Sequence, residues 1–156
     1  MDQAKTTLLT GAGETRSLGQ RLGRVLHPGD WVALRGDLGA GKTTLVSGIV
    51  EGIHPGMRSR SPTYVRVEVY GQSPAIVHAD LYRLESPEEW DTLGVEDLAD
   101  GAIVVVEWAD KASGRLPEER LDLTLEYAGA DARAIRIEPR GKRWGRRLAE
   151  SGLDPA

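Results

Sequence analysis

Cysteine, phenylalanine and asparagine are all missing from this 156-residue sequence. The absence of cysteine excludes disulfide bonds, thiol catalysis and thiolate metal sites. Histidine is scarce as well, because the chain contains only His27, His54 and His78, and their separation shows no metal-ligand spacing. A metal centre built from cysteine and histidine is therefore not expected.

Long apolar runs and a strong charge imbalance are also absent. No run reaches the roughly 20 residues that span a membrane, and the N-terminus lacks a basic-then-apolar signal pattern. The formal net charge of −4 gives no general attraction to nucleic acid. Because the chain has 40% hydrophobic and 28% charged residues, we expect one globular domain over residues 1–156, located in the cytoplasm and not in a membrane.

The most informative segment that is present is glycine-rich and covers residues 36–43, with the sequence GDLGAGKT. It matches the P-loop pattern G-x-x-x-x-G-K-[ST] at every fixed position. The apolar run Trp31–Leu34 precedes it and predicts a buried strand, whereas residues 43–51 predict a helix. The segment therefore lies between a strand and a helix, as phosphate binding requires.

In such a loop the backbone N–H groups turn inward and bind anions, assisted by the positive end of the following helix dipole. Lys42 is expected to reach the outer phosphates, and the Thr43 hydroxyl is expected to bind magnesium. The residues predicted to contact the nucleotide here are Asp37, Leu38, Gly39, Ala40, Gly41, Lys42, Thr43 and Thr44.

Periodicity predicts the remaining elements. Strands are expected at 6–9, 65–70, 75–82 and 102–106, the second and third of these antiparallel and the last one central, with a hairpin formed by 121–125 and 134–137. A helix is expected at 14–26, after a turn at 10–13. A second helix is expected to begin with a capping box at Ser86 and Glu89 and to end at Gly94. A basic C-terminal helix is expected at about 142–151.

Two carboxylates follow apolar strands and are candidates for the magnesium side of the site: Asp80 and Glu107. Periodicity does not assign which binds the metal and which orients water. Thr63, in the loop after the P-loop helix, is a candidate for sensing the terminal phosphate, although a simple Ser-Pro-Thr turn is the stronger interpretation. Trp108 either stacks near the site or fills the core, and we interpret His78 as a strand histidine without a catalytic role.

Three functions remain open at this point. Guanine-specific P-loop GTPases use an Asn-Lys-x-Asp segment, which this chain cannot contain, so ATP is the better prediction. A small-molecule P-loop kinase is the main alternative, but the inserted hairpin and short helix leave little room for an acceptor pocket and a lid. A nonenzymatic, nucleotide-dependent binding module is the third. The basic run between Arg140 and Arg147 is either a solvated helix face or a surface for RNA or an acidic partner.

Four segments together carry a resemblance to a known family. They are residues 36–44, Ser61-Pro62-Thr63-Tyr64, His78-Ala79-Asp80-Leu81-Tyr82-Arg83-Leu84 and Glu107-Trp108. In order and spacing the chain, from about residue 6 to residue 137, resembles the bacterial TsaE (YjeE) family, small P-loop ATPases of tRNA threonylcarbamoyladenosine synthesis. The resemblance implies a single P-loop NTPase domain of the α/β class, with a small mixed parallel and antiparallel sheet flanked by helices.

The resemblance also implies roles for particular residues. Thr43 and Glu107 would contact Mg²⁺, Asp80 would lie by the γ-phosphate of ATP and hold the attacking water, and Ser61–Tyr64 would act as a switch loop. The family usually has an aromatic residue where this chain has Ala79, a departure that concerns local packing more than chemistry.

For the nucleoside, the resemblance implies that the turn from Ala12 to Thr15 covers the adenine and that Arg133 reaches the nucleotide. The implied partners are TsaB and TsaD, the second of which transfers the threonylcarbamoyl group to the adenosine beside the tRNA anticodon. The ATP cycle would reset that complex, so the chain would meet tRNA only indirectly.

Overall fold

The computed structural model describes residues 4–37, 39–59, 67–112 and 114–153, which form one sheet of seven strands in the order β1-β7-β6-β2-β5-β4-β3. The strands are β1 (Lys5–Leu9), β2 (Trp31–Gly36), β3 (Val67–Tyr70), β4 (Ile76–Asp80), β5 (Ile103–Glu107), β6 (Arg120–Tyr127) and β7 (Arg133–Arg140). The helices are α1 (Ala12–Val25), α2 (Lys42–Ile53), α3 (Trp90–Leu93), α4 (Val95–Leu98) and α5 (Gly145–Glu150), with 3₁₀ turns η1 (Pro87–Glu89) and η2 (Ala109–Ala112).

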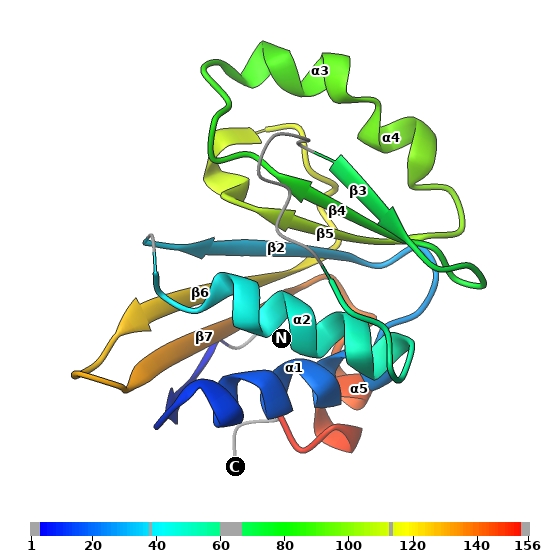
Figure 1. Cartoon of the computed structure of the whole chain (residues 1–156). Helices are drawn as coiled ribbons and strands as arrows, with labels where there is room; N and C mark the ends of the chain where they lie inside the picture. Colours follow the sequence, from blue (N-terminus) through cyan, green and yellow to red (C-terminus); the bar gives the residue numbers. More distant parts are fainter. Residues whose placement is uncertain (1–3, 38, 60–66, 113, 154–156) are drawn as a thin grey trace.

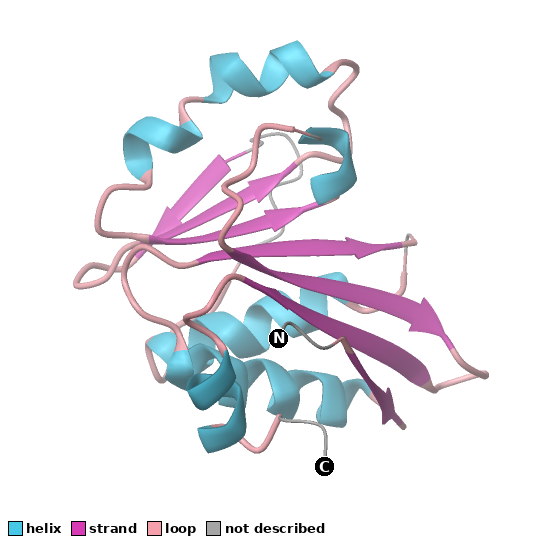
Figure 2. Ribbon diagram, turned by 180° about the vertical axis from the view of Figure 1, so that it is seen from behind, coloured by secondary structure: helices cyan, strands magenta, loops and turns pink. Residues whose placement is uncertain are grey.

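Helices cover both faces of the sheet. Figure 1 shows α1, α2 and α5 on one side and α3 and α4 on the other, and Figure 2 shows the same layers from behind. Each side has its own apolar core: Leu22, Leu45 and Ile49 belong to the first, and Trp90 and Val95 belong to the second. The predicted mixed sheet flanked by helices is confirmed.

Strand direction brings several loops to one edge of the sheet. Strands β4, β5, β2 and β6 are parallel neighbours, so their carboxyl ends lie together. Strand β1 pairs antiparallel with β7, which pairs antiparallel with β6, so β1 also ends at this edge. Ligands bind α/β sheets beyond the carboxyl ends of their strands. The P-loop after β2 and the start of α1 after β1 are therefore neighbours.

Helices α1 and α2 approach each other unusually closely because glycines line their contact. A Cβ atom added to any of these glycines would overlap a backbone carbonyl oxygen of the facing helix. The residues concerned are Gly19 and Gly23 on α1 and Gly48 and Gly52 on α2. This close packing fixes the start of α1 relative to the P-loop, which directly precedes α2.

Strand β5 is an interior strand, as predicted, because it pairs with β2 on one side and β4 on the other. All its residues are buried, which explains the continuous apolar run. The antiparallel pairing of β3 with β4 and the hairpin of β6 with β7 are also confirmed. Residues 65 and 66 of the predicted third strand lie outside the described part of the chain.

Several predicted boundaries were wrong. Helix α1 begins at Ala12 rather than Glu14, so the predicted turn at 10–13 is shorter. The expected helix beginning after Ser86 is broken into η1 and α3, and the Ser86 side chain makes no capping bond. Glu89 Oε1 accepts a hydrogen bond from the backbone of Glu85 instead, at 3.0 Å. Strand β4 ends at Asp80, and both hairpin strands extend beyond their apolar alternation.

The C-terminal helix is shorter than the predicted 142–151, because α5 covers only Gly145–Glu150. Its basic residues are partly used inside the molecule. Arg143 and Arg147 both pair with Asp30, whose side chain is completely buried. A buried carboxylate needs such partners. These two arginines therefore attach the C-terminal segment to Asp30, the residue that precedes β2.

Candidate functional site

The P-loop has the backbone that its glycines predict. Gly36, Gly39 and Gly41 have φ of 149°, 81° and 105°, values in the region that favours glycine. The N–H of Ala40 donates to the carbonyl oxygen of Asp37 at 3.0 Å and closes the turn. Helix α2 begins at Lys42, and its first N–H groups lack intrahelical partners, as in every α-helix. These groups and the helix dipole favour an anion at this position.

Lys42 folds back onto its own loop. Its Nζ donates to the carbonyl oxygens of Gly36 at 2.5 Å and Asp37 at 2.8 Å, and it lies 4.3 Å from the ring centre of Trp108. Burial lowers the pKa of Lys42, and the nearby negative charges of Glu107 and Asp80 oppose that effect. The ammonium group thus contacts the P-loop backbone and interacts electrostatically with the two carboxylates.

Three side chains at the ends of β4 and β5 form what we call the carboxylate side: His78, Asp80 and Glu107. Asp80 is directly opposite Glu107 in the parallel register, and His78 shares its face of β4 because the two are separated by one residue. Glu107 Oε2 lies 2.6 Å from His78 Nε2, and both residues are almost completely buried. The two strands therefore bring two carboxylates and an imidazole to one face.

Asp80 is the less buried carboxylate. Its Oδ1 accepts a hydrogen bond from the backbone N–H of Tyr82 at 3.0 Å. Burial raises the pKa of Asp80 above its ordinary value, helped by the charge of Glu107 and opposed by the hydrogen bond from Tyr82. A raised pKa strengthens the carboxylate as a proton acceptor.

Trp108 follows Glu107 with a left-handed backbone, at φ 56°, which is uncommon for a bulky residue. Its half-buried ring lies beside Lys42 and 5.1 Å from the ring of Tyr82, measured between centroids. The structure supports both interpretations offered by the sequence, because the ring lies beside Lys42 and also packs on the α3/α4 core. Strained backbone of this kind clusters at functional sites.

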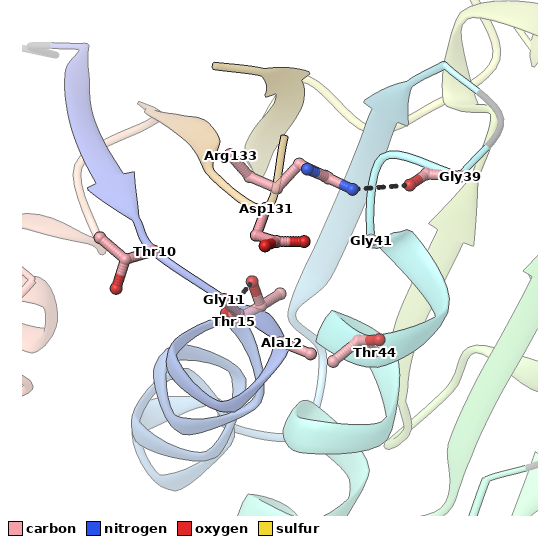
Figure 3. A pocket seen from close by; sticks show the side chains of 9 residues that line it. All are labelled: Thr10, Gly11, Ala12, Thr15, Gly39, Gly41, Thr44, Asp131 and Arg133. Carbon is pink, nitrogen blue, oxygen red and sulfur yellow. Dashed lines mark hydrogen bonds between the residues drawn. The ribbon is translucent and has the colours of Figure 1, made fainter. Parts of the chain in front are cut away.

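On the opposite side of the P-loop lies a pocket of about 440 Å³. Its walls come from the start of α1, the P-loop and the turn between β6 and β7, and Figure 3 shows their side chains converging. The lining residues are Thr10, Gly11, Ala12, Thr15, Gly39, Gly41, Thr44, Asp131 and Arg133. We call this pocket the hairpin side, and its volume falls within the range of ligand pockets.

Arg133 is held at the mouth of the hairpin side. Its guanidinium lies 4.3 Å from the ring centre of Tyr127, and Nη2 is 3.5 Å from the carbonyl oxygen of Gly39. Its Nη1 donates to the carbonyl of Ala132 at 2.9 Å. Asp131 points its carboxylate into the same pocket (Figure 3). The hairpin tip thus contributes one positive and one negative group.

Most residues predicted for the site lie around these two sides of the P-loop. Ala12, Thr15 and Arg133 line the hairpin side, whereas Asp80 and Glu107 belong to the carboxylate side. The predictions for Leu38, Thr63 and the whole Ser61–Tyr64 segment lie outside the described residues.

The sequence interpretation missed two groups. The sequence predicts His78 as a strand histidine without a catalytic role but does not predict its contact with Glu107, which the structure shows. The place of His78 two residues before Asp80, on the same face of a strand, was the available signal. Asp131 lies in the turn of the predicted hairpin, between residues 125 and 134, and nothing in the sequence places that turn opposite α1.

The residues present suit a magnesium ion that arrives with a nucleotide. In residues 4–37, 39–59, 67–112 and 114–153, no three His, Asp or Glu side chains form a cluster that could hold a metal ion. Magnesium at nucleotide sites takes only one or two protein ligands and completes its shell with phosphate and water. Glu107 and the exposed Thr43 of the first turn of α2 carry oxygen atoms of the kind that would bind such an ion.

The P-loop between an interior parallel strand and a helix, flanked by strand-end carboxylates, defines this chain as a protein with the P-loop NTPase fold. A structural comparison agrees: YdiB of Bacillus subtilis, known from a crystal structure, superposes with a TM-score of 0.78 at 28% identity, covering 97% of this chain and 96% of YdiB. The family model for Threonylcarbamoyl adenosine biosynthesis protein TsaE matches residues 9–135. The chain belongs to the TsaE family.

Curated relatives show the same relationship. The tRNA threonylcarbamoyladenosine biosynthesis protein TsaE of Streptomyces coelicolor is 38% identical over 137 residues, which cover 83% of this chain and 93% of the relative. The protein of that name from Haemophilus influenzae is 44% identical over 108 residues, or 68% of each chain. In the described part of the chain, no helix has the length and apolar character needed to cross a membrane.

Proposed function

We propose that this protein is an ATP-binding subunit that hydrolyses ATP slowly and acts as a switch in threonylcarbamoyladenosine modification of tRNA. The observation that carries the proposal is the position of the P-loop between a nucleoside-sized pocket and a pair of strand-end carboxylates. Family membership supports the pathway, since the curated relatives are named for tRNA threonylcarbamoyladenosine biosynthesis. We expect the activity in the cytoplasm, where tRNA is found, and we treat residues 1–156 as one domain.

In this proposal the P-loop holds the phosphates through backbone N–H groups of residues 37–44, including Leu38. Lys42 moves its ammonium from the carbonyls of Gly36 and Asp37 to the β- and γ-phosphates. Thr43 and Glu107 hold the magnesium ion, which, when bound, neutralises charge developing on the phosphates. Ala12, Thr15 and Arg133 enclose the adenosine on the hairpin side.

Asp80 positions the attacking water in this proposal. Its Oδ1 accepts a hydrogen bond from the backbone N–H of Tyr82, and we assign to Oδ2 the hydrogen bond from that water. The water oxygen bonds to the γ-phosphorus, the bond from phosphorus to the ADP oxygen breaks, and the water proton passes through the carboxylate to the released phosphate. Thr63 would report the presence of the γ-phosphate to the switch segment 61–64.

In this proposal the bound nucleotide controls the surface through which the protein binds its partners. In the TsaE family the partners implied are TsaB and TsaD, and this chain would reach tRNA only through them. Water, and not a metabolite, is the phosphoryl acceptor in this proposal.

The test is co-purification with TsaB and TsaD in the presence of ATP or ADP, combined with ATP turnover. We expect the complex to form with one nucleotide more strongly than with the other, and the pair to stimulate release of ADP and free phosphate. Unchanged turnover, together with many rounds of tRNA modification in the absence of this chain, would refute the switch. Phosphate transfer to a metabolite would establish a kinase instead.

A further inference from the structure

One buried group of the carboxylate side has no role in the proposal so far. His78 is only 2% exposed, and its Nε2 lies 2.6 Å from Oε2 of Glu107, which is 4% exposed. An ionised carboxylate has no proton to donate, so with Glu107 ionised the hydrogen between the two atoms belongs to Nε2 of His78. The histidine is then the donor, and it occupies one oxygen of the carboxylate.

The surroundings of His78 give no second reason for an imidazole. Among the described residues, His78 Nδ1 is a buried atom without a hydrogen-bond partner. The ring lies near that of Tyr70, with centroids 6.2 Å apart, a contact that an apolar side chain would also make. The bond to Glu107 is therefore the polar function of this side chain at the site.

Strand geometry fixes the direction of that bond. His78 and Asp80 share one face of β4, and Glu107 ends the neighbouring strand β5 directly opposite Asp80. His78 is opposite Val105, two residues before Glu107, so the imidazole approaches Glu107 from the interior of the sheet. Lys42 and the P-loop lie on the other side, beyond the ends of the strands. Since His78 engages Oε2, Oε1 is the oxygen that we assign to a ligand beyond the strand ends.

We propose that His78 is a positioning residue that holds Glu107 through Oε2 so that Oε1 is presented to the magnesium ion of the nucleotide. The inference rests on the proposed function, because it assumes that Glu107 is a magnesium ligand. Partners that orient a metal-binding side chain set metal affinity, and their loss commonly weakens binding by about 10- to 100-fold.

Variants of one position separate this role from packing. His78→Met removes the donor and keeps an apolar side chain of similar length. His78→Gln keeps an N–H donor at a distance from the backbone comparable to Nε2, whereas His78→Asn is too short to reach Glu107. The affinity for a fluorescent ADP analogue is measured by titration in EDTA and then at rising Mg²⁺ concentration.

We expect the Met variant to need about 10-fold more Mg²⁺ for the half-maximal effect, with nucleotide affinity in EDTA within about twofold of the parent. The Gln variant should recover most of the loss, and the Asn variant should not. In a Glu107→Gln background His78→Met should have no further effect. If His78→Met does not fold, as judged by thermal melting, the difference between Gln and Asn carries the test.

Equal Mg²⁺ dependence of the parent, Met, Gln and Asn proteins would overturn the inference, and so would a Gln variant as weak as the Met variant. These outcomes differ from failure of the proposed function. If the parent protein binds no nucleotide, or binds it without any response to Mg²⁺, the magnesium-dependent ATPase itself is refuted.

Discussion

On the carboxylate side, His78 and Glu107 are buried at the ends of adjacent parallel strands, whereas on the hairpin side Ala12 and Asp131 are exposed. The carboxylate side is built from residues on β4 and β5, and each of these strands is paired with another strand on either side. The second is assembled from a helix start, a glycine loop and the tip of an antiparallel hairpin. Buried side chains that are held rigidly favour catalysis, whereas a solvent-exposed polar pocket favours reversible ligand binding.

The two sides also differ in their electrostatics. Burial raises the pKa of Asp80 and lowers the pKa of Lys42, and both groups face the carboxylate side. On the hairpin side Arg133 rests on Tyr127 in partial contact with solvent. We therefore expect substitutions on the carboxylate side to change hydrolysis and substitutions on the hairpin side to change affinity.

The largest difference between the effect on hydrolysis and the effect on nucleotide affinity is expected for Asp80→Asn. The amide keeps the size of the side chain and its acceptor for Tyr82, but it cannot accept a proton from water. Hydrolysis measured as phosphate release should fall by about 100-fold or more, while nucleotide affinity changes by no more than about threefold. A parallel loss of affinity would show that the carboxylate side also carries binding.

The same variant tests the sign of the pKa shift. A carboxyl group whose pKa is higher in the folded state favours folding when protonated, so its contribution to stability is lost as pH rises through that pKa. At neutral pH the ionised group opposes folding, and Asp80→Asn should melt at a higher temperature than the parent. A lower melting temperature would contradict the raised pKa.

The next largest effect is expected on stability, at the close contact between helices α1 and α2. Gly48→Ala places a Cβ against the carbonyl oxygen of Arg16 and forces α1 away from α2. Alanine is the better helix former, so a loss of stability must come from that contact. We expect a decrease of about 1–3 kcal/mol in the free energy of unfolding, measured by denaturant titration.

The displaced α1 should also weaken nucleotide binding on the hairpin side. Gly145→Ala is the matched control, because a Cβ there meets no atom within 4 Å. Equal stability of the two alanine variants would show that the helices separate without strain.

A smaller effect is expected for Arg133→Ala. Loss of the guanidinium at the mouth of the pocket should weaken nucleotide affinity by about 10-fold, the order expected for one charge-assisted hydrogen bond. Phosphate release at saturating nucleotide should stay near that of the parent. Arg136→Ala, an exposed residue of the same strand that pairs with Glu138, serves as the control and should leave affinity unchanged.

The smallest effect is a pH dependence. Asp80 must be ionised to hold water, and its pKa is raised, so phosphate release should decline on acidification at a higher pH than an ordinary aspartate would produce. Nucleotide affinity should change less over the same interval, because the hairpin side lacks that group. A rate that is flat down to the ordinary range of aspartate would remove Asp80 from the chemistry.

Much of the fold was predictable because its elements have strong local signals. The apolar run of β5, the glycines of the P-loop and the alternation in the hairpin all gave correct elements. The helix expected after Ser86 ends at Gly94 as predicted, where φ is 72°, but its first part is the 3₁₀ turn η1 and only Trp90–Leu93 is α-helical. The boundaries of the hairpin strands depended on pairing with neighbours, which periodicity does not report.

The sequence by itself determined that a phosphate-binding loop lies between a strand and a helix, because that property resides in consecutive residues and backbone conformation. It also supplied Asp80 and Glu107 as strand-end carboxylates. Only the tertiary structure decided that His78 contacts Glu107, and that the hairpin tip faces the start of α1. Those contacts join residues far apart in the chain, and they depend on strand order and register, which no local pattern specifies.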